Sequence, residues 1–340
     1  MAALRGGQGL MRPLGPPGAL ALALVLAGCG EDTAPTAPAG QNSAEFGRAL
    51  DKAGSPSRAD FPDARAKTLQ QVADLVKAGP QIGLATSVFT PGRSRVAFGL
   101  LDSKRRFVYG RTAVYVAPSP KRPARGPYLA LASPLVVEPR FRGRGAAEEA
   151  APLAAIYATQ VPFTRAGKWS VLTVTRLKDG LFGAPSQVKV RPSSIPAVGE
   201  RPPRVSTETL ASASGNVETI DTRVPPAPEL HRVDFKDVVG RKPVALLFAT
   251  PALCESRVCG PVTDIALQLR EEFGDRVEFI HQEVFVDNEM RKGLRAPLRA
   301  FGLRTEPWLF TFDRRGRVAA RLEGSFGISE FRRAVQDALR

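Results

Sequence analysis

The stretch that decides the fold of the C-terminal part runs from Lys242 to Gly260 and reads KPVALLFATPALCESRVCG. An apolar run from Val244 to Ala249 is followed by a break, as a buried strand is at its end. Two cysteines follow, Cys254 and Cys259, and Gly260-Pro261 then opens a segment with helical spacing. A strand that delivers thiols to the start of a helix suits redox chemistry, because helix N-terminal amides stabilise a thiolate.

The segments around this stretch alternate between strand and helix. Their periodicity predicts strands at Val244–Thr250 and Val277–Phe285, helices at Val262–Phe273 and Glu289–Phe301, a hairpin of Trp308–Asp313 with Val318–Glu323, and a closing helix at Ser329–Leu339. The turn Arg314-Arg315-Gly316-Arg317 joins the two hairpin strands. This pattern is typical of an α/β domain.

The order of elements resembles the thioredoxin fold, and we assign residues 231–340 to a thioredoxin-like domain. The resemblance rests on the cysteines at a helix start, on Thr305-Glu306-Pro307 before an apolar strand, and on Gly324 after the last strand. Thioredoxin-like proteins place a cis-proline opposite the cysteines, and the resemblance implies that Pro307 is this residue.

The cysteine spacing departs from the C-x-x-C of that family. Residues five apart in one helix are separated by about 7.5 Å along the axis, beyond the roughly 7 Å that a disulfide spans between Cα atoms. A Cys254–Cys259 bond therefore requires Cys254 to lie in the loop before the helix. The lengths of the strand and helix make Cys254 the attacking thiol and Cys259 the resolving thiol. The local string Cys259-Gly260-Pro261 supports the opposite assignment, with Cys259 as nucleophile, and we adopt the first.

These residues lead to the hypothesis of thiol–disulfide exchange on secreted or envelope proteins, with Cys254, Cys259 and Pro307 as the site and Arg257 favouring the thiolate. The sequence leaves open whether the chain is such an oxidoreductase. The alternative is a non-catalytic binding or scaffold protein in which the cysteine pair is a structural disulfide.

A copper chaperone is a weaker alternative. The only histidines are His231 and His281, and neither has a further His or Cys partner at metal-ligand spacing. We expect His281 to be a packed or surface histidine, and we expect neither a metal nor another cofactor.

The N-terminus predicts export. Residues 1–29 contain two arginines, an apolar run and Leu26-Ala27-Gly28-Cys29, which resembles the lipobox of bacterial lipoproteins. The resemblance implies that Cys29 is lipidated and anchors the mature chain to a membrane outside the cytoplasm. That compartment permits disulfides, so the expected partners are the membrane and protein thiols or disulfides.

The middle of the chain divides by composition. Residues 30–78 predict a flexible tether with a short helix at Phe61–Lys77, and residues 193–230 a proline-rich linker in which Val205–Ile220 forms either a strand or a helix. Residues 79–192 predict an all-β sandwich with strands at Ile82–Phe89, Arg95–Leu101, Phe107–Val116, Tyr128–Glu138, Ala155–Pro162, Lys168–Leu177 and Gln187–Arg191.

The segment from Val161 to Val190 resembles the closing strands of bacterial immunoglobulin-like domains, with Phe163, Gly167 and Trp169 before a final strand pair. We expect the aromatic residues of this domain, which are Tyr115, Tyr128, Tyr157 and Trp169, to form core and rim packing instead of a ligand surface.

The formal net charge of +15 indicates anionic partners, but no zinc-finger, RNP-like or helix-turn-helix pattern organises the 48 basic residues. We therefore expect no nucleic acid and interpret the charge as a solvated face near an anionic membrane.

Overall fold

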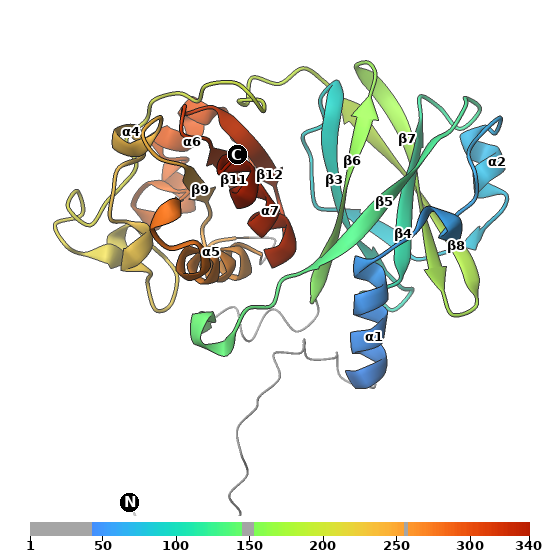
Figure 1. Ribbon diagram of the computed structural model, residues 1–340, viewed down its shortest axis with the longest axis horizontal. Coiled ribbons are helices and arrows are strands. Elements are labelled where there is room, and N and C mark those ends of the chain that lie inside the picture. The colour runs from blue at the N-terminus through green and yellow to red at the C-terminus, as the bar shows by residue number, and fades with distance from the viewer. Residues whose placement is uncertain (1–42, 145–152, 255–257) are drawn as a thin grey trace, which may run out of the picture. The chain divides into compact units, whose positions relative to one another are not determined.

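The structure is a computed structural model, and it describes residues 43–144, 153–254 and 258–340 (Figure 1). The predicted signal peptide, Cys29 and the first part of the predicted tether lie outside the described residues. The described residues belong to one compact unit. None of the helices in the described part of the chain has the length and apolar character that a membrane crossing requires.

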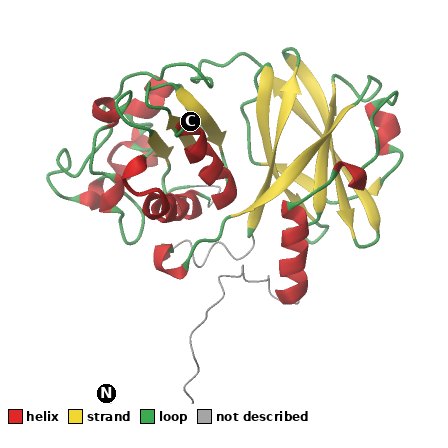
Figure 2. Cartoon of the chain, in the orientation of Figure 1, coloured by secondary structure: helices red, strands yellow, loops and turns green. Residues whose placement is uncertain are grey.

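The N-terminal half is built on β-strands, shown in yellow in Figure 2. They are β1 Lys77–Ala78, β2 Gln81–Leu84, β3 Gly92–Leu101, β4 Arg111–Ala117, β5 Arg125–Pro134, β6 Ala155–Phe163, β7 Gly167–Leu177 and β8 Gly180–Val190. They form one sheet in the order β1-β8-β7-β4-β5-β6-β3-β2. The all-β prediction is therefore confirmed for this half.

The strand β5 is shared between two parts of this sheet. Its first half pairs with β4, up to Thr112 opposite Ala130, and its second half pairs with β6 from Leu131 onward. The pairing thus divides into one sheet of β1, β4, β5, β7 and β8 and another of β2, β3, β5 and β6, and β5 joins them because it is long enough to serve both neighbours. A parallel bridge between Phe89 and Val190 links the segment after β2 to the end of β8.

The aromatic residues behave as predicted for packing. Tyr115, Tyr157 and Trp169 are buried, and Tyr128 is partly buried against the same core. The tyrosine hydroxyls that enter the core find backbone partners: Tyr157 Oη donates to the carbonyl oxygen of Gly110 at 2.8 Å. These rings therefore stabilise the β-sheet half instead of forming an exposed ligand surface.

Helices replace part of the predicted tether. The helix α1, Ser43–Gly54, places Phe46, Leu50 and Ala53 on one face, and all three are buried in the core of the β half. The prediction of a flexible segment is wrong from residue 43 onward, because these three residues recur at helical spacing and find a hydrophobic surface to cover.

The predicted helix Phe61–Lys77 is also wrong in extent. Only α2, Leu69–Ala73, is helical there, and Thr68 caps it with Gln71 in a capping box. Ala66 has a φ of 57°, which ends any helix from the N-terminal side, and β1 at Lys77–Ala78 pairs with β8 beyond it.

The C-terminal part has the order of elements expected for a thioredoxin-like fold. Its sheet contains β9 Val244–Phe248, β10 Glu278–Gln282, β11 Trp308–Phe312 and β12 Val318–Glu323, in the order β10-β9-β11-β12. β9 and β10 are parallel and are joined through α5, Cys259–Phe273, whereas β11 is antiparallel to β9 and to β12. The helix α7, Ile328–Ala338, follows the hairpin.

Each face of this sheet has its own apolar core. Ala245, Leu247 and Ala249 face the core that contains α5 and α7, while Val244, Leu246 and Phe248 face the other. This alternation follows from the two-residue period of a strand. All of β9 is buried, as its uninterrupted apolar run predicts for a central strand with both faces covered.

Two predicted helix boundaries are corrected. The predicted helix Glu289–Phe301 is a short 3-10 turn at Met290–Lys292 and then α6, Ala296–Phe301, because Gly293 has a φ of 75° and Pro297 starts a new helix. The predicted helix from Val262 instead begins at Cys259.

The predicted linker 193–230 contains no strand, and it is not a loose connection. Its 3-10 turns lie at Val217–Thr219 and Pro228–Leu230, and α4, Phe235–Val238, follows them. Outside the linker, other 3-10 turns lie at Arg58–Asp60, Pro139–Phe141, Gly274–Arg276 and Val286–Asn288. Ile195, Thr207 and Asp221 are buried, so the linker contributes to the packing of the C-terminal part.

Candidate functional site

The two cysteines lie where the sequence places them, after β9 and at the start of α5. Cys254 precedes the helix and is partly buried, and Cys259 is the first residue of α5 and is fully buried. The two cysteines are not joined by a disulfide in the structure. Glu255–Arg257 lies outside the described residues, and with it the expected role of Arg257 beside a thiolate.

The two thiols are close enough for a side-chain hydrogen bond, despite the four residues between them. This contact is possible because Cys254 lies in the loop before the helix, as the spacing argument required. The loop is a turn in which the N–H of Leu253 donates to the carbonyl oxygen of Thr250 at 3.2 Å. The chain therefore compensates for the longer spacing through its loop.

Cys259 is held as a neutral thiol. Burial raises its pKa well above the ordinary value of 9.0, and the hydrogen bond with Cys254 and the charge of Cys254 raise it further. A backbone hydrogen bond from Thr250 acts in the opposite direction. The amides at the start of α5 thus do not make Cys259 the more acidic thiol, because desolvation outweighs them.

The segment with Pro307 approaches the same sulfur. The Glu306–Pro307 peptide bond is cis, and the charge of Glu306 is felt at the Cys259 thiol. Pro307 itself is buried, at the start of β11, and its carbonyl oxygen accepts the N–H of Gly324 at 2.8 Å. The structure therefore brings together the two cysteines and the proline-containing segment.

The linker contributes to this region, which its proline-rich sequence did not indicate. Thr222 accepts a hydrogen bond from the N–H of Ala252, in the loop between β9 and Cys254, at 3.1 Å. The hydroxyl and the N–H of Thr222 both bind Glu283, a fully buried carboxylate after β10. The linker thus fixes the loop that carries Cys254.

Arg223 and Asp264 form a second contact of the linker with this region. Their buried ion pair is 2.8 Å long, and Asp264 lies in α5 one turn beyond Cys259. Burial raises the pKa of Asp264, and the guanidinium of Arg223 opposes that shift. The only indication of this ion pair in the sequence was the position of an acidic residue between the apolar residues Val262 and Ile265 of a predicted helix.

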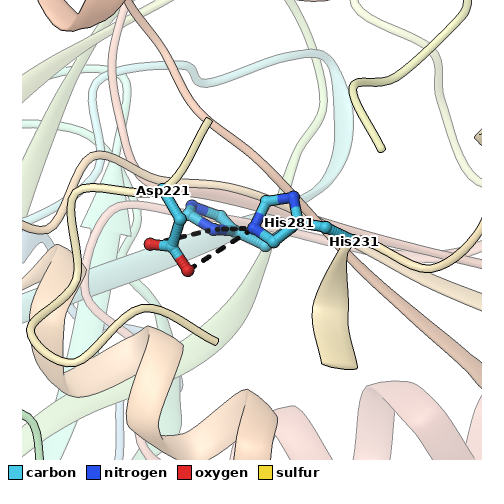
Figure 3. A group of neighbouring side chains, drawn as sticks. All are labelled: Asp221, His231 and His281. Carbon is cyan, nitrogen blue, oxygen red and sulfur yellow. Dashed lines mark hydrogen bonds and ion pairs between the residues drawn. The ribbon is translucent and has the colours of Figure 1, made fainter. Parts of the chain in front are cut away.

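Both histidines of the chain lie in a buried cluster with Asp221 (Figure 3). His231 Nε2 is 3.3 Å from His281 Nδ1 and 3.4 Å from Asp221 Oδ2, and His281 Nδ1 is 3.7 Å from Asp221 Oδ1. His281 is fully buried. The sequence showed no partner for it, because 50 residues separate it from His231.

The cluster is connected to the cysteines through one peptide group. His281 Nε2 lies 3.0 Å from the carbonyl oxygen of Ala249, which can only accept a hydrogen bond. The N–H of the same peptide group belongs to Thr250, whose backbone hydrogen bond reaches Cys259. His281 lies on the same face of β10 as Phe279, which packs in the core that contains Cys259, so His281 and the Cys259 thiol lie on the same side of the sheet.

The chain has distant structural similarity to known thiol:disulfide interchange proteins. No family model matches the chain, and no curated protein matches it. Among solved structures, a thiol:disulfide interchange protein of the thioredoxin family from Chlorobium tepidum TLS is 20% identical, with a TM-score of 0.29, covering 42% of this chain and 99% of its own. MTB dsbF is 18% identical, with a TM-score of 0.28, covering 40% of this chain and 95% of its own. The fold assignment rests on the order and direction of the strands and not on these likenesses.

Proposed function

We propose that the chain carries out thiol–disulfide exchange on proteins outside the cytoplasm. The observation that supports this most is the asymmetry of the two thiols: Cys254 is partly exposed, and it is hydrogen-bonded to Cys259, which is buried and has a raised pKa. An accessible thiol that can attack and a protected thiol that can resolve are the two parts that exchange requires.

The proposed reaction has two steps. In the direction of substrate reduction, the Cys254 thiolate attacks a substrate disulfide, forms a mixed disulfide and releases one substrate thiolate. Cys259 then gives up its proton and attacks the Cys254 sulfur, which forms the Cys254–Cys259 bond and releases the second substrate thiolate. The pair loses two electrons and the substrate gains them.

The neighbouring groups fit these steps. A Cys259 thiol in hydrogen-bond contact with Cys254 stabilises negative charge on the Cys254 sulfur before the attack. The Glu306–Pro307 segment would shape the surface on which the substrate docks, as the family resemblance implies. The Thr222 contact with Ala252 would hold the loop in place while Cys254 reacts.

We place this activity at a membrane surface. The support comes from the sequence: Leu26-Ala27-Gly28-Cys29 fits a lipobox, and lipidation of Cys29 would anchor the chain outside the cytoplasm. The β half, which we propose to be immunoglobulin-like, would then act as a spacer or present a protein-binding face. Mass spectrometry of the mature N-terminus tests the anchor, and an unmodified Cys29 would contradict it.

The exchange itself is tested by trapping. The test uses a Cys29→Ser background, in which only two thiols remain. With disulfide-bonded insulin as the substrate, Cys259→Ser should accumulate a mixed disulfide and Cys254→Ser should accumulate none. Both variants should lose insulin reduction. If Cys254→Ser keeps its activity, the proposal fails.

A measurement of the reduction potential separates exchange from a structural disulfide. Structural disulfides have potentials below about −300 mV, and exchange proteins lie above that. A Cys254–Cys259 bond that resists dithiothreitol would favour the scaffold alternative.

A further inference from the structure

The cluster of Asp221, His231 and His281 is not needed for the exchange reaction, yet β10 and a segment about 50 residues earlier in the chain converge to build it (Figure 3). Asp221 comes from the linker, His231 follows the 3-10 turn Pro228–Leu230, and His281 comes from β10. All three side chains are fully buried. A buried group of two imidazoles and one carboxylate requires a physical explanation, because each would otherwise be solvated.

The distances within the cluster favour a common centre over direct hydrogen bonds. His231 Nε2 lies 3.3 Å from His281 Nδ1 and 3.4 Å from Asp221 Oδ2, and the other carboxylate oxygen, Oδ1, lies 3.7 Å from His281 Nδ1, whereas N–H···O bonds are typically about 2.9–3.0 Å long and charge-assisted ones are shorter. Ligands that surround one zinc ion at about 2.0–2.1 Å in a tetrahedron lie roughly 3.3–3.4 Å apart. The two distances from His231 Nε2 match that spacing, and the donor atoms of all three residues lie within 4.8 Å of one another.

The surroundings aim the donor atoms at this centre. His281 Nε2 has the Ala249 carbonyl as its acceptor, so the proton of a neutral His281 sits on Nε2 and the lone pair of Nδ1 faces the cluster. Histidine ligands of metals are held in this way by a backbone carbonyl. The carboxylate of Asp221 is fixed as well, since the N–H groups of Arg223 and Ala227 each donate to one of its oxygens, at 2.9 and 2.8 Å.

The local charge also suits a divalent cation. Asp221 supplies one negative charge, and the charge of the fully buried Glu283 is felt at His281. A divalent cation between them would be neutralised by these two carboxylates, which removes the cost of an uncompensated buried charge. Among the described residues no other His, Cys, Asp or Glu completes the group, so a water molecule would take the fourth corner.

From this geometry we propose that Asp221 together with His231 Nε2 and His281 Nδ1 binds a late first-row divalent cation, with zinc the best fit to two nitrogen donors and one oxygen donor. The ion would tie the linker to β10 and to the peptide group that precedes the cysteine loop. It takes no ligand from Cys254 or Cys259, so its binding is independent of the exchange chemistry.

The proposal predicts that metal binding changes which ring nitrogen of His231 carries the proton. His231 Nδ1 has no hydrogen-bond partner among the described residues, so without metal the proton of His231 belongs on Nε2, where Asp221 can accept it. Metal binding at Nε2 moves this proton to Nδ1. Because the chain has only two histidines, imidazole ¹⁵N spectra of histidine-labelled protein report on this cluster alone.

The experiment uses the full chain with Cys29→Ser, Cys254→Ser and Cys259→Ser, so that no thiolate competes for the metal, and adds zinc after chelator treatment. We expect one equivalent to bind, the His231 spectrum to change from an Nε2–H to an Nδ1–H tautomer, and the His281 Nδ1 resonance to shift. Unchanged histidine spectra at saturating zinc overturn the proposal, whether or not metal binds elsewhere.

Variants give a second readout. His231→Gln and His281→Gln should each weaken zinc binding by on the order of 100-fold or more, while Glu229→Gln, two residues from His231, should bind as the parent does. Should the histidine variants fail to fold, the labelled parent chain still decides. Equal affinity in His281→Gln and in the parent would contradict the site.

Discussion

At the scale of single residues, the position of Cys259 sets two effects against each other. It is the first residue of α5, where helix amides favour a thiolate, and it is also fully buried, which favours the thiol. The raised pKa shows that burial is the larger effect. The sequence could reveal the helix start but not the depth of the residue, because depth depends on what α7 and the linker place over it.

This leads to a prediction for alkaline pH. In the unfolded reduced chain the thiol of Cys259 ionises near 9.0, whereas in the folded chain it keeps its proton to higher pH. The folded state then binds more protons than the unfolded state, so stability is fully present below pH 9 and falls above it, by about 1.4 kcal/mol per pH unit. Urea unfolding of the reduced protein between pH 8 and pH 10 measures this slope.

The matched control for that slope is Cys259→Ala in the same buffers. Tyr109 and Tyr157 are also buried with raised pKa values, and they add their own loss of stability at alkaline pH. The difference between the two proteins isolates the thiol. Identical slopes in both would show that Cys259 is not protected from ionisation.

From the sequence, the candidate site was predictable only for residues whose role is indicated by their neighbours along the chain. Cys254, Cys259 and Pro307 each carry a local signal in the form of a strand end, a helix start or a family resemblance. Asp221 and His231 carry none, because their environment is created by contacts between segments that are far apart in the chain. A linker rich in proline also looks like solvent-exposed chain until its partners are known.

At the scale of elements, α1 shows how a composition-based prediction fails. The segment is rich in small and polar residues, but the few large ones lie on one face, and Phe46 makes an edge-on contact with Tyr109 at 5.6 Å. Average composition predicts disorder, whereas the spacing of a few residues decides burial. By contrast, β9 was predictable because nearly every residue in it is apolar.

We predict that Phe46→Ala lowers the free energy of unfolding by about 3–5 kcal/mol. Phe46 is 5% exposed, so its removal leaves a cavity between α1 and the sheet. Arg48→Ala, at an exposed position of the same helix, should change the stability by less than about 0.5 kcal/mol. Chemical denaturation checks both values. An equal, negligible effect of the two substitutions would restore the flexible-tether interpretation.

The Arg223–Asp264 pair shows that the composition of the linker also failed to predict its burial. Both side chains are almost completely buried, and Arg223 also donates to the carbonyl oxygens of Pro225 and Phe141. Removing the guanidinium leaves Asp264 charged in an apolar environment, or forces it to take up a proton. The linker is thus a structural part of the cysteine region.

We predict that Arg223→Gln costs about 3–5 kcal/mol, because a buried pair loses one partner. Asp264→Asn in the same chain should recover part of this loss, since no uncompensated charge then remains. Arg232→Gln, at an exposed position in the adjacent segment, is the control and should be nearly neutral. A small effect of Arg223→Gln in urea unfolding would mean that the linker is not needed for the packing of α5.

At the scale of the whole molecule, close backbone contacts join the β half to the thioredoxin-like part. Gly324 has a φ of 68°, and a Cβ atom there would lie 1.8 Å from the carbonyl oxygen of Ala85. The family resemblance predicted a glycine after the last strand, but the sequence did not show that it meets the β half. Domain boundaries drawn from proline content therefore separated segments that fold against each other.

A buried ion pair between Arg95, in β3, and Glu330, in α7, also joins these parts. Two hydrogen bonds of 2.7 Å join them, and Arg95 also donates to the carbonyl oxygens of Glu323 and Ser325. The side chains are 6% and 11% exposed. This bidentate geometry satisfies most of the donors of the guanidinium, as a buried charge requires.

We predict that Glu330→Gln destabilises the protein by about 3–5 kcal/mol, since it leaves the Arg95 charge buried without its anion. The matched control is Glu272→Gln, which breaks the more exposed bidentate pair with Arg332 and should cost less than about 1 kcal/mol. If the two parts fold as one unit, Trp169 in the sheet and Trp308 in the thioredoxin-like part will report the same shifted midpoint in urea. Separate midpoints, with only the signal of Trp308 displaced, would show that the two parts unfold independently and that this ion pair does not couple them.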